Sequence, residues 1–338
     1  MILYYIIVLL ILFSIIIKNK LGKCIGWIVF VLMAYMTMFR GDNVGTDTMN
    51  YLRYNAEHRI EEYFVTGIVS LIFTGTFNER AVIYATCFVT YFFAFLNIRK
   101  YKIDVRYFCL FFFIYSFFAM GLNISRQIAA IVIVANFLPY IFDKSKKKSL
   151  LFFVGCILGA GFHISSLLLV YLYVLRFVKI SNKNDGLIIF LLGSAILLNI
   201  LPMASIMQKF LPNIYADEYS GDFQRNEGVS IIGYIYRLFT LGIYAYIYKY
   251  LSYRKDIWLY GFSAIMVNGT IGMDPSISRI FYINSYIIII YSCLAYTSYN
   301  MKKDNKLKML FWFQTLMGLY MTLSFMKNHP DLNRFEFI

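Results

Sequence analysis

The residues best suited to chemistry are four arginines at the ends of apolar stretches: Arg40, Arg126, Arg237 and Arg279. A charge at membrane depth costs roughly 3 kcal/mol unless it has a partner. The planar guanidinium can hold a phosphate or a carboxylate through two hydrogen bonds at once. We therefore expect these arginines to bind an anion, with salt bridges to nearby carboxylates as the simpler alternative.

The segment RGDNVGTDTMNY, residues 40–51, surrounds the first of these arginines with turn residues and carboxylates. Gly41 and Gly45 allow tight turns, while Asp42 and Asp47 supply acidic groups. A simple turn with solvated charges would have the same composition. The combination of two glycines and two carboxylates behind an arginine favours the wall of a pocket.

A second cluster, GLNISRQIAA, places Asn123 and Gln127 on either side of Arg126 at the expected start of a helix. A helix N-terminus favours anions and disfavours an unpaired cation. Arg126 therefore needs a negative partner or a ligand, and an ion pair alone would not explain the two amides beside it. The sequence MDPSISRIFYIN repeats this arrangement at Arg279.

His163 is the histidine that falls within an apolar stretch, in the sequence GAGFHISS. An imidazole can accept a proton near neutral pH or hydrogen-bond to a sugar hydroxyl. A lone histidine at the end of a span is often only an interfacial hydrogen-bonding residue. The glycines and serines around this one favour a proton acceptor or a partner for a sugar.

The segment from about residue 202 to 230 is acidic and aromatic, and it contains Tyr215 and Tyr219 among several carboxylates. Flat rings stack on sugar faces, and carboxylates accept hydrogen bonds from sugar hydroxyls. An amphipathic flap on the membrane surface would have the same composition. A lid over a sugar site would combine both properties.

The elements that must position these residues are membrane-spanning helices. Of the 338 residues, 60% are hydrophobic and 15% are charged, with a mean hydropathy of +0.64, whereas globular proteins need about a quarter of their residues charged. This composition excludes a soluble enzyme, a nucleic-acid-binding domain and a secreted disulfide scaffold. We expect an all-α polytopic membrane protein, one helical domain over residues 1–338, with about twelve transmembrane helices. The spans are expected near residues 2–17, 24–39, 81–98, 107–122, 127–142, 149–163, 165–178, 187–201, 231–248, 257–273, 280–297 and 309–325.

The distribution of charge predicts the orientation of these helices. If residues 64–77 form a re-entrant or interfacial helix within the outer loop 40–80, the inner loops carry +16 and the outer face carries −2, as the positive-inside rule requires. Both termini then lie outside. Of the 21 inner bases 17 are Lys, whereas 9 of the 11 outer bases are Arg. Orientation needs only positive charge, so the outer arginines indicate recognition of phosphate or carboxylate.

Signatures of metal and nucleotide chemistry are missing from the sequence. It contains no Asp-x-Asp motif, Walker loop, HExxH motif or zinc-type Cys/His spacing. We therefore predict no metal and no cofactor. The five cysteines lie in apolar stretches and are predicted to be core residues.

With these segments in view, the chain resembles the EpsG-like branch of the Wzy-type polysaccharide polymerases. The matching segments occur in the family's order over roughly residues 1–300. They are Arg40-Gly41 with Gly45-Thr46-Asp47 and Tyr51, Asn123 to Arg126-Gln127, Phe162-His163 with Ser165-Ser166, and Ser278-Arg279.

The resemblance implies an enzyme that joins oligosaccharide repeat units, carried on a polyprenyl pyrophosphate, at the outer face of the cytoplasmic (inner) membrane. Such a polymerase of O-antigen, capsule or exopolysaccharide works beside a flippase and a chain-length regulator. Interfacial arginines would hold the pyrophosphate without a metal, and either the histidine or an aspartate would orient or deprotonate the attacking hydroxyl. Taking the residue analysis and the resemblance together, the predicted catalytic residues are His163, Asp47 and Arg126, and the predicted substrate-binding residues are Arg40, Asn123, Gln127, Arg279, Arg237, Tyr215 and Tyr219.

Other functions remain as alternatives. A ligase would use the same donor but transfer a finished glycan once to another acceptor. A flippase for the lipid-linked oligosaccharide should have a polar path across the bilayer, whereas the strongly polar residues here gather at one face. A membrane acyltransferase would receive its thioester donor on the side opposite to His163, and a structural subunit would leave the outer arginines unexplained.

Overall fold

The computed structural model describes residues 1–45, 48–49, 51–52, 80–177, 242–243, 246, 257–270, 282–297, 304–333 and 335–337. Within these ranges the elements are helices, and no β-strand is present, which confirms the all-α prediction for this part of the chain. The elements are α1 (Ile2–Ile16), α2 (Lys20–Met38), α5 (Ala81–Tyr101), α6 (Val105–Ile114), α7 (Phe117–Asn123), α8 (Ser125–Phe137), η2 (Leu138–Phe142), α9 (Lys146–Ser149), α10 (Leu151–Ala160), η3 (Ile164–Phe177), α15 (Ile257–Thr270), α17 (Tyr282–Thr297), α19 (Asn305–Asn328) and α20 (Pro330–Asn333).

Several of these helices are long and apolar enough to cross a bilayer. Among the described residues the candidates are α2, α5, α8 continued by η2, and α19, and the bent pair α6–α7 makes a fifth if it counts as one span. Shorter apolar helices are α1, η3 and α17. The described helices thus support a multi-pass membrane protein, while the predicted number of about twelve spans is not confirmed by them. The predicted segments 64–77, 187–201, 202–230 and 231–248 lie outside the described residues, apart from isolated positions in the last.

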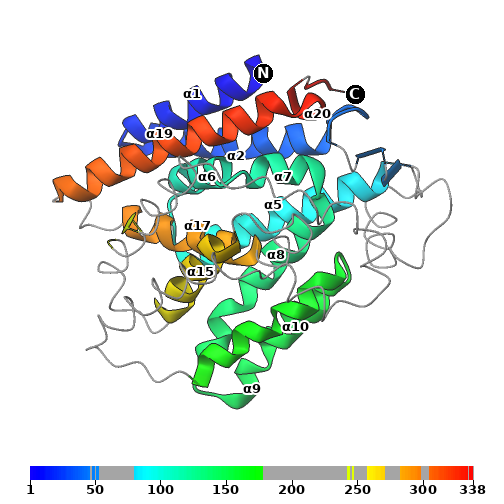
Figure 1. Ribbon diagram of the computed structural model, residues 1–338, viewed down its shortest axis with the longest axis vertical. Coiled ribbons are helices and arrows are strands. Elements are labelled where there is room, and N and C mark those ends of the chain that lie inside the picture. Colours follow the sequence, from blue (N-terminus) through cyan, green and yellow to red (C-terminus); the bar gives the residue numbers. More distant parts are fainter. Residues whose placement is uncertain are drawn as a thin grey trace. The chain divides into compact units, whose positions relative to one another are not determined.

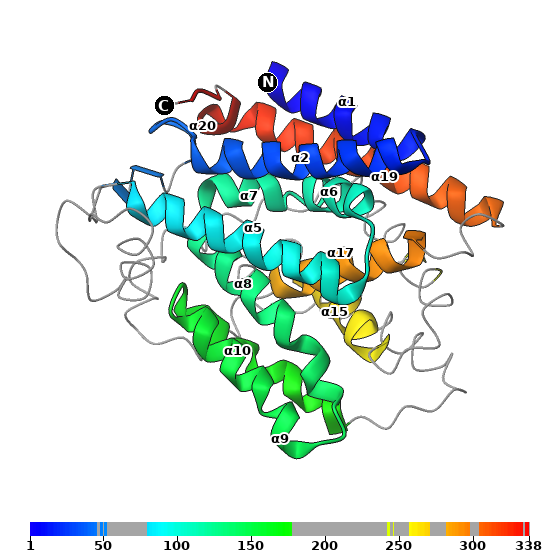
Figure 2. The same cartoon turned by 180° about the vertical axis from the view of Figure 1, so that it is seen from behind.

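The chain divides into two compact units, residues 1–173 with 289–338, and residues 174–288. In the first unit α1, α2 and α19 all pack against α6, and the N-terminus and the C-terminus are close together (Figure 1, Figure 2). The ammonium group of Met1 donates a hydrogen bond to the carbonyl of Asn333 at 3.0 Å. In the second unit the described helix α15 is linked to the start of α17 by a buried hydrogen bond from Ser263 Oγ to Asn284 Oδ1 at 3.1 Å.

Helices α5 and α8 of the first unit run parallel and are joined by side chains that bind the partner backbone. Asn97 Nδ2 donates to the carbonyl of Val132 at 3.1 Å, and Asn136 Nδ2 donates to the carbonyl of Phe93 at 2.9 Å. Polar side chains that bridge helices stabilise packing inside a bilayer, where lipid offers them no partner. These bonds therefore fix the register between the two helices.

Helix α10 packs against α8 in the opposite direction through small residues. A Cβ on Gly155 would come within 2.6 Å of Phe137, and one on Gly159 would come within 3.1 Å of Val134. Glycines let helix backbones approach closely in membranes. This antiparallel register brings the C-terminal end of α10 toward the start of α8.

The predicted span 107–122 corresponds to two helices, α6 and α7, with a break between them. The axes of α6 and α7 differ by 63°, and Ser116 between them has a φ of 60°. The break leaves carbonyls without helical partners. Thr322 of α19 donates to the carbonyl of Ile114 at 2.9 Å, and its hydroxyl lies 3.2 Å from Ser116 Oγ.

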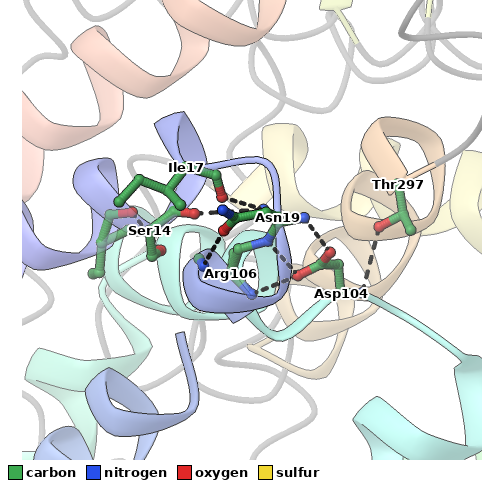
Figure 3. Close-up of polar contacts among 8 residues, drawn as sticks. Ser14, Ile17, Asn19, Asp104, Arg106 and Thr297 are labelled. Atoms are coloured by element: carbon green, nitrogen blue, oxygen red, sulfur yellow. Dashed lines mark hydrogen bonds and ion pairs between the residues drawn. The ribbon is translucent and has the colours of Figure 1, made fainter. Parts of the chain in front are cut away.

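At the opposite end of the unit from the termini, Arg106 joins three parts of the chain (Figure 3). Its Nε and Nη2 donate to the two oxygens of Asp104 at 2.9 and 2.7 Å, and its Nη1 donates to the carbonyl of Ile17 at 3.0 Å. Burial acts to raise the pKa of Asp104, but hydrogen bonds and the charge of Arg106 outweigh it and hold that pKa below its usual value. We call this the inner end, after the predicted orientation, and the end with the termini the outer end.

Candidate functional site

Arg40 follows α2 directly and is completely enclosed, with 0% of its surface exposed. Its Nε donates to Thr48 Oγ1 at 2.9 Å, and its Nη1 donates to the carbonyl of Thr37 at 2.7 Å. The same Nη1 lies 3.5 Å from the sulfur of Cys87 on α5. Each of these acceptors is formally neutral in its usual state, so they orient the guanidinium without cancelling its charge.

The remaining nitrogen of Arg40, Nη2, is buried and has no hydrogen-bond partner among the described residues. The nearby carboxylate of Asp42 forms an ion pair with Arg80 instead, and Arg80 also donates to the carbonyl of Arg40 at 2.9 Å. A buried charge is costly unless an opposite charge compensates it. Arg40 therefore requires an anion, either Asp47, which lies outside the described residues, or a ligand.

The loop that follows Arg40 presses against the segment before α8. Gly45 has a φ of +87°, and a Cβ at this position would overlap the carbonyl of Leu122 and lie 3.3 Å from the Cα of Asn123. Glycine adopts such a conformation at no steric cost. The sequence expectation that Gly45 serves a tight turn is confirmed, and the turn brings the loop against the predicted site residue Asn123.

Neighbouring residues of α5 link Arg40 to the start of α8. Cys87 contacts Arg40, as described above, while Thr86 Oγ1 donates to the buried hydroxyl of Ser125 at 3.3 Å. Arg126 is the next residue and stands in the first turn of α8, as predicted, with a half-buried side chain. Two arginines 86 positions apart in the sequence are thus linked to consecutive residues of α5. Arg40 contacts Cys87 directly, and Arg126 is linked to Thr86 through the preceding residue, Ser125.

His163 lies just beyond α10 and is held by Ser165. Its Nδ1 is 2.7 Å from Ser165 Oγ and accepts the backbone N–H of Ser165 at 3.3 Å. Because a backbone N–H can only donate, Nδ1 is an acceptor, and a neutral ring then carries its proton on Nε2. This arrangement suits His163 to donate a hydrogen bond through Nε2.

Phe162, the residue before His163, places this segment beside the first turns of α8. Its side chain belongs to a buried cluster with Val89, Ala129 and Ala130. Ala129 and Ala130 follow the predicted site residues Arg126 and Gln127 within about one helical turn. The outer end of the unit therefore brings together three segments that are distant in the sequence: residues 40–45 with Thr48, residues 122–127 and residues 162–165.

The structure describes half of the predicted site residues. Five lie at this outer end, namely Arg40, Asn123, Arg126, Gln127 and His163. The other five, namely Asp47, Tyr215, Tyr219, Arg237 and Arg279, lie outside the described residues, so their placement stays a prediction.

The residues that hold Arg40, which are Thr37, Thr48 and Cys87, were not predicted from the sequence. Thr37 precedes Arg40 by three positions, the spacing of one helix face, and this was the one available signal. Cys87 was predicted only as one of five core cysteines. Four of the five are buried, whereas Cys24 is exposed, because it lies on an outward face of α2.

Comparison with known proteins identifies the family of this chain. No match was found among curated proteins or among solved structures. The model of the EpsG family matches residues 23–335, which include all three segments of the outer end. The chain therefore belongs to the EpsG family, and EpsG-like proteins are Wzy-type polymerases.

Proposed function

We propose that the protein is a polysaccharide polymerase that joins oligosaccharide repeat units, each carried on a polyprenyl pyrophosphate, at the outer face of the cytoplasmic membrane. The observation that carries this proposal is that residues 40–45 with Thr48, residues 122–127 and residues 162–165 meet at the outer end of the first unit, where the guanidinium of Arg40 is buried. A diphosphate anchored in lipid meets cationic groups best at this depth of the membrane.

The half-buried Arg126 is the proposed direct contact to the pyrophosphate, and Arg40 adds positive charge from beneath it. The hydroxyl oxygen of the acceptor unit attacks the anomeric carbon of the donor sugar, and the bond from that carbon to the phosphate oxygen breaks. The electron pair leaves with polyprenyl pyrophosphate. Guanidinium groups already oriented toward this oxygen stabilise the developing charge more than they stabilise the bound donor.

The proton of the attacking hydroxyl needs a base, and we assign this role to Asp47. His163 uses Nδ1 to accept from Ser165, so in this proposal its Nε2–H orients a sugar or phosphate oxygen. Arg237 and Arg279 would complete the pyrophosphate site, and Tyr215 and Tyr219 would stack on the sugar rings. The acceptor side thus supplies a carboxylate base, and the donor side supplies guanidinium groups.

The contact between Met1 and Asn333 puts both termini at one end of the first unit. It supports the proposal that both termini lie on the same side of the membrane. That this side is the outer one, with about twelve spans in all, is proposed from the distribution of charge and hydropathy along the sequence. A flippase and a chain-length regulator would be partners in the same pathway. The products proposed are O-antigen, capsule or exopolysaccharide chains.

The test is the replacement of Arg126 by Ala, with Arg99→Ala as the matched control. Arg99 is exposed near the other end of α5, so its loss removes a cation without touching the proposed site. Purified variants in liposomes would receive lipid-linked repeat units, and products would be separated by length. The wild-type protein and the Arg99 variant should give a ladder, and the Arg126 variant should give none at an equal protein level.

A normal ladder from a stably inserted Arg126→Ala variant would refute the role of Arg126. An Arg126→Lys variant keeps the charge but loses the planar fork, so a strongly reduced ladder is expected if two-point binding matters. A single transfer product from the wild-type protein, in place of a ladder, would identify a ligase.

A further inference from the structure

The described residues 331–333 and 335–337 run back along residues 40–45. We call residues 40–45 the loop, and the C-terminal residues beside them the strap. The carbonyl of Glu336 accepts the N–H of Gly41 at 2.8 Å, and Arg40 forms an antiparallel bridge with Phe337. Farther along the loop, the N–H of Gly45 donates to the carbonyl of Asp331 at 3.2 Å. The strap thus supplies backbone partners to both glycines of the loop.

A side chain of the strap adds to these backbone contacts. Asn43 Nδ2 donates to Glu336 Oε1 at 3.1 Å. The fit between the two segments is close at Gly41, where a Cβ would come within 2.5 Å of Glu336 Cγ. Because the strap contacts the loop at Arg40, Gly41, Asn43 and Gly45, displacement of the strap should also displace the loop.

The strap is itself anchored to the first two helices. The carbonyl of Asn333 accepts from the ammonium of Met1, and Phe335 packs edge-on against Tyr4 with ring centroids 5.7 Å apart. Phe337 packs against Tyr35 of α2, also at 5.7 Å. These contacts hold the strap in place independently of the loop.

We infer that the strap positions the loop that holds Arg40 for glycosyl transfer, with the backbone carbonyl of Glu336 as a positioning contact. This inference rests on the proposed function. The guanidinium of Arg40 is oriented by hydrogen bonds to the carbonyl of Thr37 and to the hydroxyl of Thr48. Thr48 follows the loop in the sequence, so its position depends on that of the loop. The strap therefore holds the loop in position, and the loop in turn holds the guanidinium of Arg40 in its orientation. The strap can act in this way without contacting the substrate.

The thiol of Cys87 provides a readout that does not depend on activity. It is 1% exposed and lies between Arg40 and the carbonyl of Thr37. Thiol reagents need access to the sulfur, so opening of the loop should raise its reaction rate with N-ethylmaleimide. The experiment uses the full-length chain in which the other four cysteines are replaced by Ala.

The key variant ends at Asn333 and therefore lacks Glu336 and Phe337. We expect Cys87 labelling to rise at least about 10-fold and ladder formation to fall by a similar factor. The matched control is Cys156, which is equally buried at 1% but lies on α10. It is measured in a second protein in which Cys156 is the one cysteine retained. Its labelling should stay at the wild-type rate, because the loss of the strap is a local change.

A second pair of variants tests the strap without truncation. Gly41→Ala should push Glu336 away and raise Cys87 labelling, whereas Gly41→Ala combined with Glu336→Ala removes the overlapping Cγ and should restore much of the wild-type rate. Glu336→Gln keeps the acceptor for Asn43 and should behave as wild type.

Unchanged Cys87 labelling in the shortened chain would overturn the inference, as would an equal rise at Cys156, which indicates general unfolding. Increased Cys87 labelling with full ladder formation would also overturn it, because the loop would then be open without consequence for transfer. Failure of the proposed function is a separate result, in which the wild-type protein itself forms no ladder.

Discussion

Two buried arginines at opposite ends of the first unit are satisfied in different ways. At the inner end, Arg106 forks onto both oxygens of Asp104 and also binds a carbonyl at the end of α1. At the outer end, Arg40 binds a hydroxyl, a carbonyl and a sulfur, and its Nη2 has no partner among the described residues. The charge of Arg106 is therefore neutralised within the chain by Asp104, whereas no described carboxylate neutralises the charge of Arg40.

This difference separates a structural arginine from a candidate for function. Removing one member of a buried ion pair leaves an uncompensated charge behind and is strongly destabilising. Removing a buried charge that has no carboxylate partner among the described residues leaves none of their carboxylates uncompensated. Arg106 should therefore matter for folding and Arg40 for activity, and variants of the two can test this contrast.

The largest effect is expected for Arg106→Ala. It leaves the carboxylate of Asp104 at 7% exposure without its counter-ion, which should lower the free energy of unfolding by about 3 kcal/mol. Unfolding of the purified protein in mixed micelles, followed by tryptophan fluorescence, would measure this loss. The double variant with Asp104→Asn should recover part of it, and ladder formation per folded molecule should remain normal in both.

Arg40→Gln should have the converse result. Loss of the charge is expected to reduce ladder formation about 100-fold, the scale of one preorganised electrostatic contact. The free energy of unfolding should change by less than about 1 kcal/mol, because no carboxylate among the described residues is left unpaired. A stable variant with full activity would contradict the contrast, as would an Arg40 variant that unfolds as readily as the Arg106 variant.

A smaller effect should follow from Gly45→Ala, which alters the outer end without removing charge. The left-handed backbone costs about 1 to 2 kcal/mol for a residue with a Cβ, and the added carbon would overlap the carbonyl of Leu122. We expect ladder formation to fall about 10-fold. Gly121→Ala is the matched control, because its Cβ would meet only Thr37 Cγ2 at 3.7 Å.

The smallest effect should be a loss of stability in acid that depends on Asp104. Its pKa is lower in the folded protein than in the unfolded chain, so the ion pair stabilises the fold above about pH 4 and this contribution disappears as the pH falls through the folded pKa. The expected change is on the order of 1 kcal/mol. Unfolding measured from pH 7 to pH 3 should show it in the wild type and not in Asp104→Asn.

Much of the helical architecture follows from the sequence, because apolar stretches of membrane length are a strong local signal. The expected spans 24–39 and 81–98 correspond to α2 and α5, with ends that differ by a few residues. The break between α6 and α7 does not follow in this way. It depends on Gly318 and Thr322, which pack against Ile114 from the far end of the chain.

The candidate site was predictable in its residues more than in their environment. Arg126 in the first turn of α8 and the tight turn at Gly45 follow from local rules. The hydrogen bond between His163 and Ser165 also has a readable spacing of two residues. Complete burial of Arg40 beneath the strap has no local signal, because the two segments are about 290 positions apart.

The bend between α6 and α7 has a consequence for how the protein is made. The carbonyl of Ile114 receives its hydrogen bond from a threonine that is synthesised 208 residues later. An unsatisfied carbonyl in lipid costs several kcal/mol. Before α19 has inserted, a straight helix through residues 105–123 should therefore be more stable, because it gives this carbonyl a partner within the helix. We therefore expect the bend between α6 and α7 to form only when α19 inserts, late in synthesis.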